Sequence, residues 1–385
     1  MPSEFDRVID RSGGDAIKWN RYAPGVLPLW IADMDFAAPS AVMDALARRL
    51  GHGVFGYGAP WPSLVEAVVG HLAQEYDWSV DPDWLLWLPG LVTGLNVACR
   101  AVGEPGSAVF TATPIYPPFL LSPRWSQRRV VSAPLKLEDG RWQWDFAAVE
   151  SALIPDTKLF LLCHPHNPVG RAWRQEELRE IAAIARRHDL VVCSDEIHCG
   201  LILEPGRRHL PFAALDADAA RRSITLMAPS KTFNIPGLGC AFAVIPDAGL
   251  RRAFGEAMLG IVPHVNVFGL AATEAAYRHG GAWQAALLDY LRGNRERVEA
   301  AVAVLPGLSM ARVEATYLAW IDTRELDRIG GDSSPGQFFE SAGVGLSGGS
   351  DFGGDAYRSC VRLNFGCPRA ILDAALERIA RAVGD

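Results

Sequence analysis

The sequence has no excess of basic residues, no long hydrophobic run and no closely spaced pair of cysteines. Its 37 Lys and Arg residues against 44 Asp and Glu residues give a net charge of −7, which disfavours binding to a nucleic-acid backbone. No segment approaches the roughly 18 apolar residues that a membrane-spanning helix needs. The first residues carry charges where a secretion signal would need an apolar core. We therefore expect neither a nucleic-acid partner nor a membrane partner.

The seven cysteines form no CxxC motif, and several stand inside apolar runs. Buried, reduced thiols of this kind are typical of cytoplasmic proteins. His164 and His166 have no metal-ligand spacing to a carboxylate or a cysteine, so we expect no metal site. The chain has 385 residues, of which 49% are hydrophobic, and this is enough for a packed core in two or three domains.

Five short apolar runs in the middle of the chain are typical of strands buried on both faces of a parallel sheet. They are Ala108–Thr111, Lys158–Cys163, Leu190–Cys193, Ile224–Met227 and Cys240–Ile245. A helix is predicted at Gln175–His188, because Leu178, Ile181 and Ala185 form an apolar stripe at helical spacing. The alternation predicts an α/β fold with right-handed crossovers.

The two ends of the chain differ from this middle part. Helical patterns at Leu287–Val304 and Ala370–Val383 surround short strands at Tyr317–Ile321 and Cys360–Phe365, which indicates a smaller α+β domain. The first fifty residues are irregular apart from one expected helix at Ser40–Leu50. We therefore divide the chain into an N-terminal arm with part of the small domain (1–50), a large domain (51–285) and a small C-terminal domain (286–385).

Residues with useful side-chain chemistry follow four of the predicted strands. Tyr116, Asn167, Asp195 and Lys231 come after the first, second, third and fourth strand, respectively. Ligands of parallel α/β sheets bind beyond the carboxyl ends of the strands, so these side chains are expected at one edge. Each residue alone has a plainer interpretation, since an Asp often caps a helix and an Asn-Pro often makes a turn. Their order and common location favour one shared site.

A second candidate feature is the turn Pro-Gly-Leu-Val-Thr-Gly-Leu at residues 89–95. It has the character of a tight turn that opens a helix, where backbone N–H groups can bind a phosphate. The two glycines alone are a weak signal, because the spacing of the known nucleotide-binding motifs is absent.

Several motifs together resemble one enzyme superfamily. Asn-Pro-Val-Gly at 167–170, Ser-Asp-Glu at 194–196 and Ser-Lys at 230–231 are similar to the signature of fold-type I pyridoxal-phosphate (PLP) enzymes, the aminotransferase class I/II superfamily. Within it, the chain resembles the cystathionine β-lyase branch of C–S lyases over nearly its whole length. The segments that carry this closer resemblance are 18–19, 27–36, 55–57, 195–198, 229–235, 316–320 and 361–366.

The resemblance implies a PLP transferase fold, with a large domain around a mostly parallel sheet and a smaller α+β domain. It also implies PLP as cofactor and a role for each site residue. Lys231 would form the Schiff base and act as base and acid at Cα, while Asp195 would face the pyridine nitrogen. The other expected cofactor contacts are Asn167 at the phenolic oxygen, Tyr116 on the ring face, and the N–H groups of Leu91 and Val92 with the Ser230 hydroxyl at the phosphate.

Three further residues receive roles from the resemblance. Arg362 is expected to bind the substrate α-carboxylate, with a surface ion pair as the plainer alternative. Tyr57 is expected to reach the phosphate of the second subunit of a homodimer, with a packed loop aromatic as its alternative. Trp30 lies in a segment that either closes over the substrate or serves as a packed dimer arm.

Two positions depart from the usual aminotransferase pattern. Gly239 stands eight residues after Lys231, where many aminotransferases have a phosphate-binding Arg, and His198 stands three residues after Asp195 in place of a Tyr. Both departures favour the lyase branch and leave the phosphate with less positive charge around it. His198 either adjusts the ring oxygen or is a hydrogen-bonded interior histidine, while His164 and His166 are interpreted as loop residues.

Three functions compete on these observations. The first is β-elimination of L-cystathionine or another cysteine S-conjugate to a thiol, pyruvate and ammonia. The second is transamination, which would use the same catalytic residues. The third is a PLP-sensing regulator, but the residues before 50 are too few and too weakly basic for a DNA-binding domain.

Overall fold

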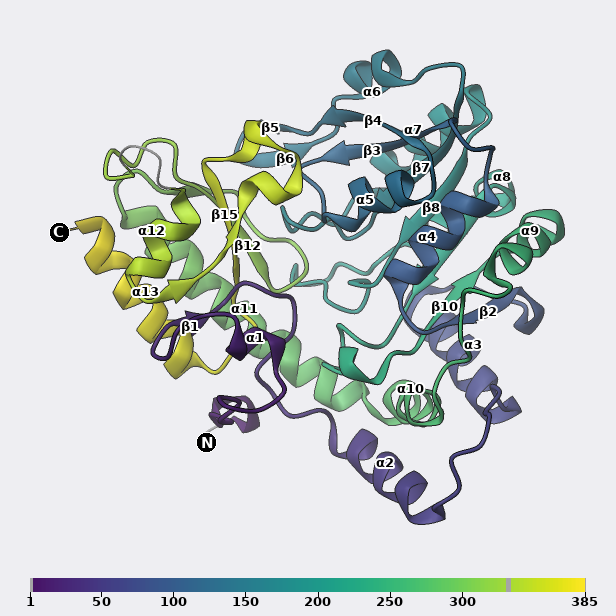
Figure 1. Cartoon of the computed structure of the whole chain (residues 1–385), viewed down its shortest axis with the longest axis horizontal. Helices are drawn as coiled ribbons and strands as arrows, with labels where there is room; N and C mark the ends of the chain where they lie inside the picture. Colours follow the sequence, from purple (N-terminus) through teal and green to yellow (C-terminus); the bar gives the residue numbers. More distant parts are fainter. Residues whose placement is uncertain (1–2, 330–333, 385) are drawn as a thin grey trace.

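The structure is a computed structural model that describes residues 3–329 and 334–384. A seven-stranded sheet forms the centre of its larger part (Figure 1). The strands stand in the order β2-β10-β9-β8-β7-β3-β4. Their bounds are Leu85–Leu88 (β2), Ala108–Thr113 (β3), Arg129–Pro134 (β4), Thr157–Cys163 (β7), Val191–Asp195 (β8), Ser223–Met227 (β9) and Ala241–Val244 (β10).

One strand of this sheet runs against the others. The sequence predicts a strand at Cys240–Ile245 within a parallel sheet, and the strand is present as β10, but it pairs antiparallel with both β9 and β2. The parallel interpretation was wrong for this strand because no crossover helix separates β9 from β10, and a chain that returns without a crossover pairs antiparallel. The strand is nevertheless buried along its whole length, so its apolar run does not reveal its direction.

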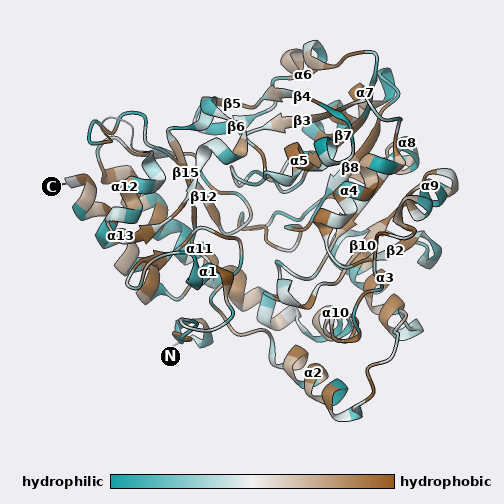
Figure 2. Cartoon of the chain, in the orientation of Figure 1, coloured by the Kyte–Doolittle hydropathy of each residue, from teal (hydrophilic) through white to brown (hydrophobic). Residues whose placement is uncertain are grey.

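Helices cover both faces of the sheet, and the side-chain alternation of β7 shows how. Leu159 and Leu161 pack on the face covered by α4, α5 and α9, whereas Phe160 and Leu162 pack with α6 and α7 on the opposite face. In Figure 2 the hydrophobic colour runs along β7 and β8, while the covering helices carry both colours. The helices of this part are α3 Pro62–Tyr76, α4 Leu91–Ala101, α5 Pro118–Trp125, α6 Phe146–Ala152, α7 Gln175–Arg187, α8 Ala217–Arg221, α9 Ala248–Met258 and α10 Val267–His279.

The predicted helix after β7 is present as α7, although no Ser, Thr, Asp or Asn precedes it. The Glu177 carboxylate accepts a hydrogen bond of 2.7 Å from the backbone N–H of Arg174, and this contact closes the N-terminus of the helix.

The C-terminal part is built on an antiparallel four-stranded sheet in the order β11-β12-β15-β14. The long helix α11 and the C-terminal helix α13 pack beside it (Figure 1). The bounds are α11 Gly281–Val304, β11 Ser309–Met310, β12 Leu318–Asp322, α12 Pro335–Ser341, β13 Val344–Gly345, β14 Ser347–Gly348, β15 Cys360–Asn364 and α13 Arg369–Gly384.

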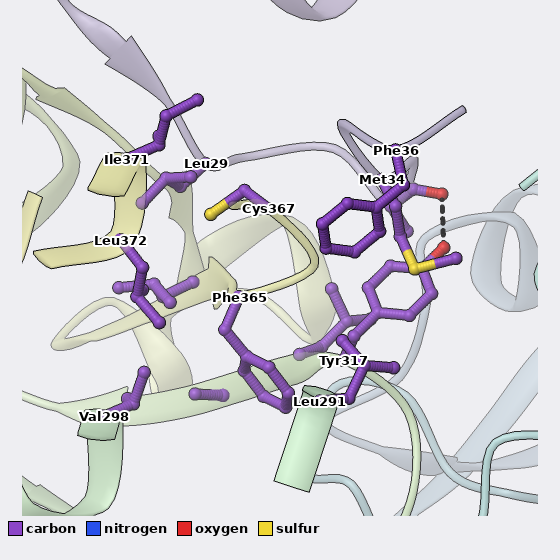
Figure 3. Close-up of a cluster of buried hydrophobic side chains, with 14 of the residues drawn as sticks. Leu29, Met34, Phe36, Leu291, Val298, Tyr317, Phe365, Cys367, Ile371 and Leu372 are labelled. Carbon is purple, nitrogen blue, oxygen red and sulfur yellow. Dashed lines mark hydrogen bonds between the residues drawn. The ribbon is translucent and has the colours of Figure 1, made fainter. Parts of the chain in front are cut away.

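The N-terminal segment packs against this C-terminal part. β1 (Leu27–Pro28) pairs parallel with β13, and Leu29, Met34 and Phe36 enter the same hydrophobic cluster as Phe365 and Leu372 (Figure 3). The expected helix at Ser40–Leu50 is α2, Ser40–His52, and it packs against α10. The remaining α-helix of the described chain is α1 Ile17–Asn20, and the remaining strands form the hairpin of β5 Lys136–Glu138 with β6 Arg141–Gln143.

No helix in the described part of the chain is both long enough and apolar enough to span a membrane. The predicted domain boundaries at residues 50 and 285 stay a prediction.

Candidate active site

A cavity of about 240 Å³ lies at the carboxyl ends of β7, β8 and β9. Tyr116, Asn167, Asp195 and Lys231 all line it, so the structure brings together the four residues that follow the predicted strands. The other lining residues include Ile31, Ala32, Gly90, Leu91, Val92, Cys163, His198, Ser230, Gly239, Cys240 and Arg362.

Lys231 is the amine of this cavity. Burial lowers its pKa to about 8, and the nearby Arg362 guanidinium acts in the same direction, whereas Asp33 and Asp195 oppose the shift. Its Nζ donates a hydrogen bond to the carbonyl of Ala32. An amine with this pKa is neutral in an appreciable fraction of molecules near neutral pH, so it can act as a nucleophile or a base.

Asp195 is the acid of the cavity. Burial raises the pKa of its carboxyl to about 7, and the neighbouring Glu196 adds to this shift, whereas the N–H of Ile197 opposes it by donating to Oδ1 at 3.1 Å. No salt bridge within the described residues includes Asp195. A buried carboxylate without a cation is costly, so the cavity suits a ligand that brings a protonated nitrogen to this point.

The N-terminus of α4 closes another side of the cavity. Leu91 and Val92 are its first two residues, and Gly90 precedes them without a side-chain cap. The first N–H groups of a helix have no acceptor within the helix, which makes this end suitable for a phosphate. Ser230 lines the same cavity and offers a hydroxyl.

Gly239 also lines the cavity, in a left-handed conformation with φ of 55°. A Cβ at this position would lie 3.2 Å from the carbonyl oxygen of Pro89, so the turn favours glycine for both reasons. Lys231 and Arg362 are the two cationic side chains among the described residues that line the cavity. Among the described lining residues the arginine is Arg362 of β15, and the position that carries a phosphate-binding Arg in the usual aminotransferase pattern is Gly239.

Arg362 reaches the cavity from β15 of the C-terminal sheet. Its Nη1 donates to Asn167 Oδ1 at 2.9 Å and its Nη2 donates to the carbonyl of Trp30 at 2.8 Å. Its side chain is buried, so the alternative of a surface ion pair does not describe it. The same bonds tie the N-terminal segment and the β7 loop to one guanidinium.

Trp30 contributes to the site through its backbone carbonyl, which contacts Arg362. Its carbonyl accepts from Arg362, while its indole Nε1 donates to the carbonyl of Lys18 at 3.1 Å. Its neighbours Ile31 and Ala32 line the cavity, and the Trp30 side chain is not among the lining residues described.

His198 is 2% exposed and lines the cavity. Neither ring nitrogen makes a hydrogen bond within the described residues, and Nδ1 is fully buried. Burial lowers its pKa to about 3, with Lys231 and Arg362 acting in the same direction, so the ring is neutral. The alternative of a hydrogen-bonded interior histidine is therefore wrong, and the ring is free to bond a ligand.

A second, wider cavity of about 690 Å³ shares Lys231, Ile31 and Ala32 with the first. A charged cluster that was not predicted from the sequence forms its wall. Arg11 pairs with Asp33 at 2.9 Å and with Asp35 at 2.6 Å, and the buried Lys18 pairs with Asp35 at 2.7 Å. The two acids belong to the segment 27–36, which carries part of the family resemblance, but the partners named here lie 17 to 24 residues away with no recognisable spacing.

Tyr57 lies outside both cavities of its own chain. It is fully exposed in the connection between α2 and α3, and it lines a separate surface depression with Trp61 and Arg278. The packed loop aromatic considered as its alternative is therefore wrong for the single chain.

Comparison with known proteins places this architecture in a family. Residues 24–379 match the family described as aminotransferase class I and II. Cystathionine beta-lyase PatB of Bacillus subtilis is 38% identical over 98% of this chain and 99% of the relative. Protein MalY of Escherichia coli is 32% identical over 99% and 98%, respectively.

Solved structures agree with this assignment. The crystal structure of OvoB superposes with a TM-score of 0.94 at 49% identity and covers 98% of both chains. Cystalysin from Treponema denticola, whose structure contains a pyridoxal 5′-phosphate cofactor, superposes with a TM-score of 0.93 at 30% identity and covers all of both chains. The predicted fold class, fold type I of the PLP enzymes, is confirmed. The chain belongs to the aminotransferase class I and II family.

Proposed function

We propose that this protein is a PLP-dependent C–S β-lyase that cleaves L-cystathionine or a related cysteine S-conjugate. The overall reaction takes up one water and yields a thiol, pyruvate and ammonia. The observation that carries the proposal is the pairing, in one cavity, of a buried amine with a lowered pKa and a buried carboxyl with no cationic partner. PatB and other relatives named cystathionine beta-lyase support this reaction over other chemistry of the family.

The residues of the cavity fit PLP. Lys231 would hold the cofactor through Nζ, Asp195 would take the ring nitrogen, and the α4 N-terminus with Ser230 would take the phosphate. Asn167, Tyr116 and the unpartnered His198 ring remain for the phenolic oxygen and the ring face. Bound there, PLP supplies an electron sink for the negative charge that remains at Cα after deprotonation.

The chain's own residues handle the protons. Lys231 Nζ takes the proton from the substrate Cα and can deliver a proton to the departing thiolate sulfur, because its lowered pKa lets it both gain and lose a proton near neutral pH. The Asp195 carboxylate holds a proton at the ring nitrogen, which keeps the electron sink effective.

Arg362 is the group proposed to bind the α-carboxylate of the substrate. Its guanidinium is buried and already oriented by Asn167 and Trp30, and its Nε has no hydrogen-bond partner among the described residues. A planar fork fixed in this way suits a carboxylate. Trp30 acts here by orienting Arg362.

The reaction type is tested with the purified holoenzyme and L-cystathionine. We expect equal amounts of thiol, pyruvate and ammonia without an added keto acid, and a cofactor absorbance that returns to its resting value after each turnover. If a single turnover instead leaves pyridoxamine phosphate and activity requires a keto acid, the protein is an aminotransferase.

We also propose a cytoplasmic homodimer in which Tyr57 contacts the phosphate in the neighbouring subunit. Tyr57 is fully exposed and does not line the cavity of its own chain, and Val54 and Phe55 beside it are more than half exposed. A second subunit would cover this apolar surface. The seven free, buried cysteines support the cytoplasmic location.

A further inference from the structure

A buried polar cluster lies directly behind Asp195. Glu196 is wholly buried, and its Oε1 accepts from the Ser194 hydroxyl at 2.7 Å and from the Phe212 N–H at 3.0 Å. Its Oε2 lies 2.7 Å from Nε2 of the buried His209. Because side chains alternate along β8 and its extension, Ser194 and Glu196 point away from the cavity that Asp195 faces.

This cluster joins the two loops that carry the ring-binding residues. The His209 ring contacts the His164 ring with 4.4 Å between centroids and an angle of 32° between the planes, and His164 begins the loop that leads to Asn167. His164 Nε2 donates to the carbonyl of Leu210 at 3.0 Å, and its Nδ1 accepts from the Trp173 N–H at 3.4 Å. Glu196 therefore holds the Asp195 loop to the segment 209–212, which in turn supports the Asn167 loop.

The burial of both carboxyls, Glu196 and its neighbour Asp195, disfavours a second negative charge in the cluster. Glu196 and Asp195 are adjacent and both buried, and each carboxylate would disfavour ionisation of the other. The partner that could neutralise Glu196 is His209, but burial and the nearby Arg207 lower the pKa of that imidazole to about 3. Burial also raises the pKa of Glu196 to about 7. Once a cationic ring nitrogen binds at Asp195, the single negative charge is most stable there.

We propose that Glu196 is a positioning residue that acts as a neutral acid: its Oε2 proton is donated to Nε2 of a neutral His209, and Asp195 alone carries the negative charge under the cofactor. The hydrogen bonds hold the Asp195 and Asn167 loops in place. The neutrality prevents repulsion that would otherwise weaken the ionised state of Asp195. This inference rests on the proposed PLP site and concerns residues that touch neither cofactor nor substrate.

The Glu196→Gln variant mimics the proposed neutral, protonated side chain, so it separates the effect of charge from the effect of the hydrogen bonds. In Glu196→Gln the amide oxygen can accept from Ser194 and Phe212, and the amide NH₂ can donate to His209 Nε2. Glu196→Ala removes all three bonds. Glu176→Gln is the matched control, since it makes the same change at an exposed side chain of α7. The readouts are kcat and the pH titration of the absorbance of the bound cofactor, which needs no turnover.

We expect Glu196→Gln and the control to keep kcat within about threefold of the parent, and the absorbance of the bound cofactor to titrate at the same pH as in the parent. Glu196→Ala should lose at least about tenfold in kcat. A titration midpoint of Glu196→Gln displaced by about one pH unit would show that the native residue is ionised, and would overturn the proposal. Unchanged kcat and titration in Glu196→Ala would overturn the positioning role. Absence of β-elimination by the parent protein would refute the lyase function while leaving the titration test intact.

Discussion

At the scale of single residues, burial shifts the pKa values of the two groups proposed to exchange protons, Lys231 and Asp195. Burial brings the pKa of the Lys231 amine down to about 8 and that of the Asp195 carboxyl up to about 7, so each stands near the pH at which it can exchange a proton. No salt bridge in the described chain includes Asp195, and the charge of Lys231 offsets the effect of burial only in part, so a protonated nitrogen of the ligand would stabilise the carboxylate further. The site is therefore incomplete until a cofactor with a basic ring nitrogen binds.

We predict that Asp195→Asn retains the cofactor and loses at least about a hundredfold in kcat, because a neutral amide cannot hold a proton at the ring nitrogen. The measurement is kcat for pyruvate formation together with the cofactor content of the purified variant. Near-normal turnover would show that Asp195 is only the acceptor for the Ile197 N–H.

How far the site could be predicted depends on sequence distance. Tyr116, Asn167, Asp195 and Lys231 could be predicted because each follows a strand, and the topology of a parallel sheet then brings them together. The bonds from Arg362 to Asn167 and to the Trp30 carbonyl could not, because they join segments 195 and 332 residues apart. Tertiary packing of the N-terminal segment, which leaves no periodic signal, decides these contacts.

At the scale of elements, the sheet was predictable where apolar runs are long and the direction of pairing follows from a crossover. β3, β7, β8 and β9 meet this condition, and β10 does not. β2 was not predicted because it has only four residues, of which Leu86 and Trp87 are half-buried, and it lies at the edge of the sheet. A short edge strand carries too few residues for a period to emerge.

Helix α4 provides an element-scale prediction, because its position sets the proposed phosphate site. A Cβ on Gly94 would lie 2.9 Å from both Leu226 methyl groups and 3.0 Å from a methyl of Leu88, so α4 packs closely on the sheet. We predict that Gly94→Val lowers the free energy of unfolding by about 1–3 kcal/mol through overpacking and weakens cofactor binding. Urea denaturation and a PLP titration of the cofactor-free protein measure the two effects.

Gly70 of α3 is the matched control for this substitution, since a Cβ there meets nothing within 4 Å. Gly70→Val should change the free energy of unfolding by less than about 0.5 kcal/mol. Equal losses in the two variants would mean that close packing of α4 on the sheet is not the cause, and valine is in any case the better helix former of the two residues.

At the scale of the whole molecule, the proposed dimer makes each active site a product of two chains. One site would contain Lys231 of its own subunit and Tyr57 of the other. We predict that Lys231→Ala and Tyr57→Ala are each strongly impaired alone and that their mixed dimer regains activity, because one of its two sites has both native residues. Co-expression with two affinity tags isolates the mixed dimer, and a mixed dimer as inactive as its parents would place both residues in the same subunit's site.

The amine that follows β9, Lys231 Nζ, is the group proposed to carry the cofactor. Borohydride reduction of the holoenzyme followed by peptide mapping tests this directly. The structure predicts a single phosphopyridoxyl group on Lys231, and a folded Lys231→Ala protein with no covalently held cofactor. Attachment at any other lysine would contradict the roles assigned to Lys231, Asp195 and the N-terminus of α4 together.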